Sequence, residues 1–327
     1  MEALRRSWQI LDNYALARLI RRPSAAGFWY LPDAPNVTDA ASLALYRAAD
    51  RSPVYLVDYR TRTQFRHENA DGIATLPYPR PLGSRVNPEA AFQYALGWHD
   101  RFVRDGDAGA LEPFLRHARY FRKLQNATGD FPYEFEWFEN KVPWFSALAQ
   151  SRGASVMLRA YLMTGEKAYA ASASAALSRF GAPCESGGFA ATFPLTRLAY
   201  FEEYPQQKNA VINGFMASLF GLYEAKEWLG DRNAERLWKQ GVHSLEAMLP
   251  FYTLPWWSLY DRSGPDAGRN LHSPRYKTMV VGYLAVLAAL TGSEILAAYH
   301  AKWAAMNVLP NRLAAYGLKF VRKLRYR

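Results

Sequence analysis

The sequence contains little cysteine and no long apolar run, and these absences exclude several classes of protein. Cys184 is the single cysteine among 327 residues, which excludes an internal disulfide framework and is typical of a reducing compartment. No apolar stretch approaches the roughly 20 residues that a membrane-spanning helix needs. Residues 1–22 carry arginines at both ends of a stretch that polar residues interrupt, unlike a secretory leader. We therefore expect a cytoplasmic protein.

Motifs for metals, cofactors and nucleic acids are also missing. The six histidines are scattered without the spacing of metal ligands. The chain has no glycine-rich phosphate loop, no dinucleotide fingerprint and no recognised nucleic-acid motif. Cys184 lies in a turn with nearby glycines and has no evident histidine partner, so we interpret it as a thiol without a catalytic role. We expect no metal, no organic cofactor and no nucleic-acid partner.

The positive charge is concentrated at the two ends of the chain. Lysine and arginine number 40 against 29 acidic residues, which gives a net charge of +11. Residues 1–22 contain five arginines and two acids, and residues 310–327 contain six basic residues and no acid. Leucines and aromatic residues alternate with the cations in this C-terminal tail. Three interpretations stay open: a helix packed on the body with a solvated basic face, a peripheral contact with the inner face of an anionic membrane, or a contact with a polyanion.

Between these ends the sequence has the composition of a folded, mainly helical protein. Half of the residues are hydrophobic and 15% are aromatic, which excludes a disordered chain. Residues 1–22 have helical periodicity, whereas residues 23–90 are rich in proline and contain alternating runs such as PVYLVDYRTRTQF, which predict a β-hairpin or isolated strands. A helix begins at Asn87-Pro88, a cap followed by proline. Further helices are predicted over 110–125, 143–164, 166–179, 209–229, 233–249, 277–290 and 294–306, with a strand-like interruption near 185–205.

Short joints divide these helices into pairs. The joints TGEKAY, LGDRNAE and TGSEIL place Gly165, Gly230 and Gly292 where the residue after a helix belongs. Paired helices without a sequence repeat favour a mainly α fold, an incomplete (α/α) toroid with a small N-terminal β-containing segment. We predict three regions: residues 1–90 with a helix and a β-hairpin or loop segment, residues 91–309 with the toroid, and the basic tail 310–327.

Two of the intervals between helices are rich in chemistry. The first is FEEYP, with Glu203 and Tyr204. The second is LPWWSLYDRSGPDAGRNLHSPRYKT, which brings tryptophans, tyrosines, arginines and an aspartate into one loop. Aromatic rings stack on the apolar faces of sugars, and arginine pairs with carboxylates in a bidentate manner. These loops are therefore typical of a site for a sugar acid.

The stretch from about residue 143 to 306 resembles the C-terminal catalytic domain of the D-glucuronyl C5-epimerases of heparan sulfate and heparosan synthesis. The matching words are PWFSALAQ, the RAYL helix, FEEYP, INGFMASLFGLYEAKEWLG, SLEAMLPFY and SLYD, followed by Asn270-Leu271 and Tyr276 in the same order. One loop departs from the family pattern, because HSPRYKT replaces a segment with an Arg and an Asp before the tyrosine and a His after it.

The resemblance implies an isomerase that converts D-glucuronic acid to L-iduronic acid within a heparosan-like polymer. Such an enzyme removes the C5 proton and returns one from the opposite face, which needs two acid–base groups. By resemblance Glu203 and Tyr276 form this pair, with Tyr204 and Tyr260 lining the site. The resemblance also implies substrate contacts for Trp144 and Gln150. The arginines of the second loop, Arg262 and Arg275, are further candidates because arginine pairs with a sugar carboxylate.

A basic tyrosine needs a cationic neighbour to lower its pKa. Arg262, Arg275 and Lys277 are the candidates by sequence. The expected partner is an anionic, uronate-containing polysaccharide, and a homodimer is an open alternative.

Other functions fit parts of this pattern. A polyuronate lyase begins with the same proton abstraction. An inverting glycosidase needs two carboxyl groups about 6.5–9.5 Å apart, which Asp261 and Glu203 supply only if their loops converge. A non-catalytic polysaccharide-binding subunit of an export or synthesis complex is the alternative that the altered HSPRYKT loop favours.

Overall fold

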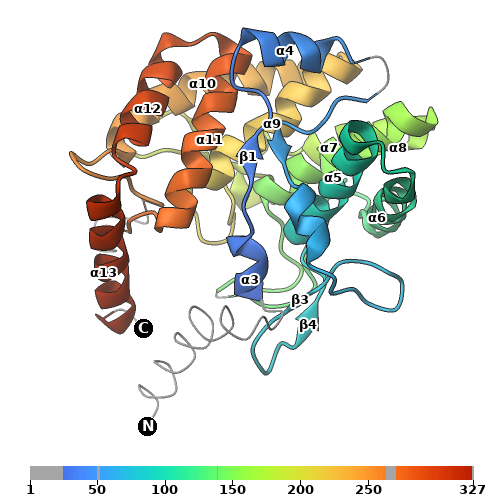
Figure 1. Cartoon of the computed structure of the whole chain (residues 1–327), viewed down its shortest axis with the longest axis horizontal. Helices are drawn as coiled ribbons and strands as arrows, with labels where there is room; N and C mark the ends of the chain where they lie inside the picture. Colours follow the sequence, from blue (N-terminus) through green and yellow to red (C-terminus); the bar gives the residue numbers. More distant parts are fainter. Residues whose placement is uncertain (1–24, 50–51, 138, 263–269, 326–327) are drawn as a thin grey trace.

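Paired helices arranged in a ring dominate the structure (Figure 1). The computed structural model describes residues 25–49, 52–137, 139–262 and 270–325, so the helix expected over 1–22 lies outside the described residues. Four helical hairpins follow one another along the chain, each an inner helix paired with an outer one. Their bounds are α5 Pro88–Asp105 with α6 Leu111–Leu124, α7 Ala147–Thr164 with α8 Lys167–Leu177, α9 Ile212–Leu229 with α10 Arg232–Tyr252, and α11 Pro274–Thr291 with α12 Glu294–Ala305.

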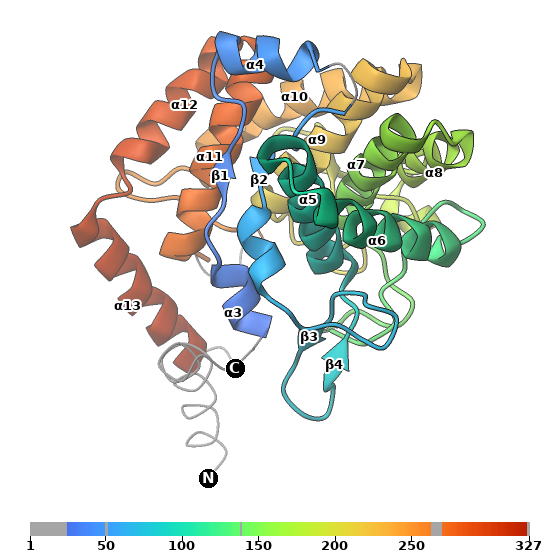
Figure 2. The ribbon, with the colours of Figure 1, turned by 45° about the vertical axis from the view of Figure 1, so that its right-hand side comes forward.

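The inner helices α5, α7, α9 and α11 pack in sequence against one another, and the outer helices cover them (Figure 2). Small residues let α7 and α9 approach closely. A Cβ at Gly221 would meet the carbonyl oxygen of Ser151, and the Ser151 hydroxyl donates to the Ala217 carbonyl at 2.9 Å. The outer helix α10, by contrast, buries one face and leaves charged residues such as Glu235 and Lys239 on the other. The predicted mainly α, incomplete (α/α) toroid is confirmed.

The two ends of the ring are built differently. Each hairpin turns through a short joint at one end, where Gly106, Gly165, Gly230 and Gly292 end the inner helices in the left-handed conformation, with φ between 64° and 76°. Long loops lead into the inner helices at the opposite end. Two short hairpins lie in these loops: β3 Leu76–Pro77 with β4 Ser84–Arg85, and β5 Ala190–Thr192 with β6 Ala199–Phe201, both antiparallel.

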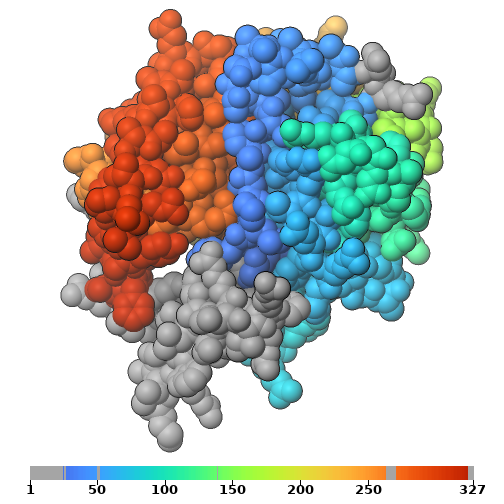
Figure 3. All heavy atoms as spheres, viewed as in Figure 1, coloured from blue at the N-terminus to red at the C-terminus, as the bar shows by residue number. Residues whose placement is uncertain are grey.

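The N-terminal segment fills the gap in the ring between α11 and α5. Strand β1 contacts α11, and the 3-10 helix η2 contacts α5. Figure 3 shows this segment as a continuous band between the last and the first helices of the ring. Its elements are α3 Ala25–Tyr30, β1 Ala34–Pro35, α4 Ala40–Arg47, β2 Val57–Asp58 and η2 Arg60–Gln64, with β1 and β2 antiparallel.

A buried ion cluster fastens this segment to the ring. Asp33 accepts two hydrogen bonds from the Arg275 guanidinium, at 2.9 and 2.7 Å, and one from Arg62 at 3.1 Å. The Asp33 side chain is only 4% exposed. The carboxylate is compensated by both guanidinium groups, whose other N–H groups donate to the Leu31 carbonyl and the Gln93 side chain.

The structure refines the predictions for residues 23–90. The run PVYLVDYRTRTQF does not form a hairpin, because Val57–Asp58 is a short strand paired with β1 and the next residues turn as η2. The segment also contains two helices, α3 and α4, that the proline-rich pattern hid. Helix α7 begins at Ala147, four residues after the predicted start at Pro143, since Trp144 is bridged to Tyr133 in extended conformation.

The basic tail forms a helix, α13 Leu309–Arg325, that contacts the ring near the long-loop end. Lys319 donates a hydrogen bond to the Leu271 carbonyl at 2.7 Å. Leu309, Leu313 and Phe320 are more than half exposed. Among the residues described, none of the helices is both long enough and apolar enough to cross a bilayer.

Candidate functional site

The four residues expected to act on the substrate lie in the long loops, at the N-terminal ends of the inner helices. Glu203 and Tyr204 follow β6 and precede α9. Tyr260 lies in the loop between α10 and α11, and Tyr276 lies in the first turn of α11, where its amide donates to the Ser273 hydroxyl at 3.3 Å. Because the inner helices direct their positive dipole ends toward these loops, the arrangement favours an anionic ligand.

Glu203 is a buried carboxyl group with an unusual proton affinity. Its side chain accepts a hydrogen bond from the Asn213 amide at 3.3 Å, and a Cβ at Gly214 would collide with it. Burial raises the pKa of Glu203 to about 7, against hydrogen bonding from Tyr204 and the charge of Arg152, which lower it. A carboxyl group with this pKa changes between acid and base near neutral pH.

Tyr204 and Tyr260 lie beside this carboxyl group, and Tyr276 lies beside both of these tyrosines. The rings of Tyr260 and Tyr276 meet edge to face, with centroids 5.5 Å apart. Burial, then the negative charge of Glu203, hold the pKa of Tyr204 well above its ordinary range, and the same two causes raise the pKa of Tyr260. Both phenols are therefore proton donors at neutral pH.

The cations expected beside these tyrosines are placed elsewhere. Arg262 is exposed. Arg275 binds Asp33 and the carbonyl of Leu31, so its guanidinium fastens the N-terminal segment. Lys277 is buried, and burial lowers the pKa of its ammonium group to about 7. Neither Tyr204 nor Tyr260 has a lowered pKa, and the lowering expected for a basic Tyr276 stays a prediction.

A buried arginine that the sequence reasoning missed lies close to the site instead. Arg152, on α7, donates to the hydroxyls of Tyr59 at 2.8 Å and Tyr283 at 2.6 Å and forms an ion pair with Glu89. Its charge is one cause that lowers the pKa of Glu203. The sequence does contain a signal for it: Arg152 stands in a run of small and apolar residues, ALAQSRGASVML, which predicts a buried helix. A charge in a buried helix requires partners, so it marks a polar cluster in the interior.

Lys277 belongs to a buried series of hydrogen-bonded side chains, Lys277, Ser258 and His272, next to Tyr260. Its Nζ donates to the Ser258 hydroxyl at 2.9 Å, and that hydroxyl lies 3.0 Å from Nδ1 of His272. The His272 ring meets Tyr260 at 5.9 Å, edge to face. Burial lowers the pKa of His272 well below its ordinary value. These hydrogen-bonded side chains therefore support the Tyr260 loop from the protein interior.

The other predicted substrate contacts have different surroundings. The Trp144 ring stacks on Tyr133 with centroids 3.7 Å apart and lies 5.9 Å from the Tyr204 ring. Gln150 is completely buried, and its amide binds the loop before α7, donating to Asp130 at 3.1 Å and accepting from the Phe131 amide at 2.8 Å. Trp144 thus borders the tyrosine cluster, whereas Gln150 holds a neighbouring loop.

Other features considered from the sequence lie apart from this cluster. Burial raises the pKa of the half-buried Cys184 thiol to about 12, so it is unreactive near neutral pH. In the part of the chain that the structure describes, no group of three or more His, Cys, Asp or Glu side chains has an arrangement that could hold a metal ion.

Comparison with solved structures finds distant likenesses. The unsaturated glucuronyl hydrolase of Bacillus sp. GL1, described as responsible for the degradation of glycosaminoglycan, is 14% identical, with 70% of this chain and 60% of that chain covered and a TM-score of 0.45. A UGL variant solved with dGlcA-Glc-Rha-Glc is 15% identical, with 79% of this chain and 64% of that chain covered and a TM-score of 0.47.

Comparison of sequences gives a more specific result. A D-glucuronyl C5-epimerase of Caenorhabditis elegans is 31% identical over 58% of this chain and 34% of its own length. An uncharacterized protein of Methanocaldococcus jannaschii is 28% identical over 52% of this chain and 55% of its own. The chain thus spans about a third and about half of the lengths of these relatives. The family model described as D-glucuronyl C5-epimerase C-terminus matches residues 125–305, more than half of the sequence, and the chain belongs to this family.

Proposed function

We propose that this protein is a polysaccharide C5-epimerase that converts D-glucuronic acid residues to L-iduronic acid residues in a heparosan-like polymer. The observation that carries the proposal is the buried Glu203, with a pKa of about 7, among Tyr204, Tyr260 and Tyr276. Family membership supports the same activity.

The reaction requires a base and an acid on opposite faces of the sugar ring. The ionised Glu203 carboxylate takes the C5 proton, and the electron pair of the C–H bond moves into the carboxylate group of the substrate. The resulting enediolate carries extra negative charge, which protonated phenols and helix N-termini stabilise. Tyr276 then donates its proton to C5 from the opposite face.

The resting state has to be restored after each inversion. One turnover leaves a protonated Glu203 and a deprotonated Tyr276, so one proton must pass between them. Tyr204 and Tyr260 lie close to both groups, and we assign them to stabilising the enediolate or relaying this proton. Because the reaction is reversible, each member of the pair acts as acid in one direction and base in the other.

Proton exchange at C5 tests the proposal directly. The full chain is incubated with heparosan-type polymer in heavy water, and NMR detects deuterium at C5 and new iduronate signals. Deuterium together with iduronate is the expected result. Unsaturated, ultraviolet-absorbing ends, with or without deuterium at C5, would reassign the protein to the lyases. Binding of the polymer without exchange would favour a non-catalytic binding subunit.

A matched pair of variants separates the site from the fold. Glu203→Gln removes the base and should abolish exchange. Glu202→Gln changes the adjacent buried carboxyl group, whose pKa burial raises to about 8 and which accepts a hydrogen bond from the Ala210 amide. A glutamine at 202 keeps an acceptor for that amide, so this variant should retain exchange. Loss of activity in both variants alike would count against a specific role of Glu203.

A further inference from the structure

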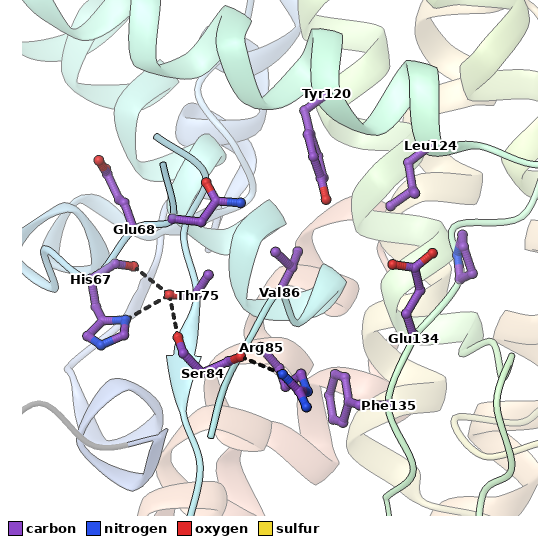
Figure 4. A pocket seen from close by; sticks show the side chains of 12 residues that line it. His67, Glu68, Thr75, Ser84, Arg85, Val86, Tyr120, Leu124, Glu134 and Phe135 are labelled. Carbon is purple, nitrogen blue, oxygen red and sulfur yellow. Dashed lines mark hydrogen bonds between the residues drawn. The ribbon is translucent and has the colours of Figure 1, made fainter. Parts of the chain in front are cut away.

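Two surface features outside the tyrosine cluster differ in what they could bind. One is a cavity of about 580 Å³ between the β3–β4 hairpin and α6 (Figure 4). Glu68, Arg85 and Glu134 line it, and all three side chains are exposed. Exposed charges of both signs are screened by water, so this cavity favours no particular ligand. The other feature is the outer side of α13, which is apolar.

Helix α13 is attached to the ring by a side that carries polar residues. Asn311 donates a hydrogen bond to the Trp256 carbonyl at 3.1 Å, and Lys319 donates to the Leu271 carbonyl at 2.7 Å. Ala315 lies midway between these two positions in the sequence and is completely buried. Residues four positions apart share one face of a helix, so this face is the one that contacts the ring.

The opposite side of α13 is apolar and exposed. Its residues follow the three- and four-residue spacing of one helical face, and their exposed fractions lie between 44% and 67%. We call these residues the α13 stripe: Leu309, Leu313, Tyr316 and Phe320. Figure 2 shows the helix at the margin of the molecule, next to the end of α12.

This arrangement is the reverse of that in an ordinary surface helix. A helix that only covers the body of a protein turns its apolar residues inward and its charges toward water, as α10 does. Among the side chains of α13 that the structure describes, Lys319 and Arg322 are partly buried, whereas Leu318 and Val321 are exposed like the stripe. A continuous exposed apolar surface indicates that another surface covers it.

The charge of the helix favours one kind of cover. Residues 308–327 contain six basic residues and no acid. A second copy of α13, or the arginine-rich residues 1–22, would bring further cations against these six. A uronate polymer would pair with the cations, but its hydroxyl and carboxylate groups cover leucine side chains poorly. The surface of an anionic bilayer offers negative headgroups and, just below them, an apolar layer.

We propose that α13 docks the protein on a membrane surface that contains anionic lipids. The α13 stripe enters the boundary between headgroups and acyl chains, and the cations of the helix remain at the level of the headgroups. Because Lys319 joins α13 to the loop that contains Tyr260 and Leu271, docking brings the tyrosine cluster close to the membrane surface. This contact does not depend on which reaction the site performs.

Sedimentation of the full chain with vesicles tests the proposal. Vesicles of phosphatidylcholine are compared with vesicles in which roughly a third of the lipid is phosphatidylglycerol. The protein should bind the anionic vesicles at least about tenfold more tightly, since each cation near the surface contributes to binding. Added salt should weaken this binding, because it screens the headgroup charge.

A matched pair of double variants separates the stripe from exposed apolar residues in general. Leu313→Ser with Phe320→Ser shortens the stripe without changing the charge, and binding to anionic vesicles should fall about tenfold or more. Leu45→Ser with Leu195→Ser changes two side chains that are also more than half exposed but lie on α4 and in the β5–β6 loop. This control should bind like the unmodified protein. Unfolding curves establish that both variants are folded.

The other possible occupants give different results. No binding of the full chain to anionic vesicles, equal binding to neutral vesicles, or binding that the stripe variant leaves unchanged would each overturn the proposal. A dimer in place of vesicle binding, abolished by the stripe variant, would assign the stripe to a second copy. Loss of affinity for the polymer alone would assign it to the polymer. Vesicle binding that depends on the stripe, without C5 exchange on any polymer, would support the docking helix and count only against the epimerase.

Discussion

Asp33 binds the guanidinium of Arg275 at 2.7 and 2.9 Å, although 242 positions separate the two residues in the chain. The pair joins the N-terminal segment to the first turn of α11, one residue before Tyr276. Ring closure and the placement of a proposed catalytic tyrosine thus depend on the same contact.

Removing Asp33 should therefore destabilise the protein strongly. Asp33→Ala leaves Arg62 and Arg275 buried without their carboxylate, a change that typically costs about 3–5 kcal/mol. Urea unfolding followed by circular dichroism measures this loss. Asp105→Ala is the control, because it breaks an exposed ion pair with Arg60 and should cost about 0–1 kcal/mol. Equal effects of the two substitutions would show that the Asp33 cluster does not hold the ring closed.

The activity should depend on the ionisation of Glu203. The base form is populated above a pKa of about 7, so the rate of C5 exchange should fall about tenfold per pH unit below pH 6. The measurement is the initial exchange rate from pH 4.5 to 8.5. A rate that is flat across this range would remove Glu203 from the role of base.

The raised pKa of Glu203 also predicts how the free energy of unfolding changes with pH. The folded-state pKa of Glu203 is raised from 4.5 to about 7, so between these values the folded chain holds a proton that the unfolded chain has lost. This carboxyl group therefore lowers stability progressively as pH rises through that window, by on the order of 3 kcal/mol in full. Glu203→Gln should be more stable than the unmodified protein at pH 8 and nearly equal to it at pH 4. Denaturant unfolding at both pH values checks the difference.

Loss of the Tyr276 hydroxyl should affect chemistry without affecting the fold. Tyr276→Phe keeps the ring contact with Tyr260 but removes the proposed acid on the opposite face, and iduronate formation should fall by at least about 10²-fold. Tyr299→Phe, on the outer helix α12, should form iduronate at the rate of the unmodified protein. Near-normal iduronate formation by Tyr276→Phe would exclude this hydroxyl from the mechanism.

Helix α13 gives a prediction about surfaces. Deletion of residues 310–327 should weaken binding to vesicles that contain anionic lipids or to the polymer, because it removes six cations together with the exposed Leu313 and Phe320. Vesicle sedimentation and polymer titration measure the two effects. Lys319→Met separates them, since Lys319 contacts the Leu271 carbonyl and its loss should alter polymer turnover more than vesicle binding. Unchanged binding to both would make the helix a structural element.

Local signals explain how much of the fold could be predicted. The Asn87-Pro88 cap and the glycines of the short joints act within a few residues, and the helices they bound were predicted to within a few residues at most ends. Residues 25–64 form two-residue strands, short helices and a 3-10 turn, which have no sustained periodicity, so their course could not be read from the pattern.

In the candidate site, too, the residues marked by local sequence were predicted, whereas contacts between distant segments were not. Glu203, Tyr204, Tyr260 and Tyr276 were found because they stand in the words that carry the family resemblance, and they lie together in the structure. Arg275 stands in the same loop, but its partner Asp33 lies far away in the sequence, so neighbouring positions predicted the wrong surroundings. Arg152 was missed because its partners Glu89, Tyr59 and Tyr283 come from three separate elements.

Closure of the ring by its first described segment also sets an order of events in folding. A ribosome makes residues 25–64 before any of the four hairpins, yet α11, which these residues contact, is made nearly last. Asp33 can meet Arg62 early, but it must wait for its second partner until Arg275 has emerged. The hairpins can form one by one from local contacts, but the loop that places Tyr276 becomes rigid only at this final long-range docking. Acquisition of the site and completion of the fold would then be a single late event.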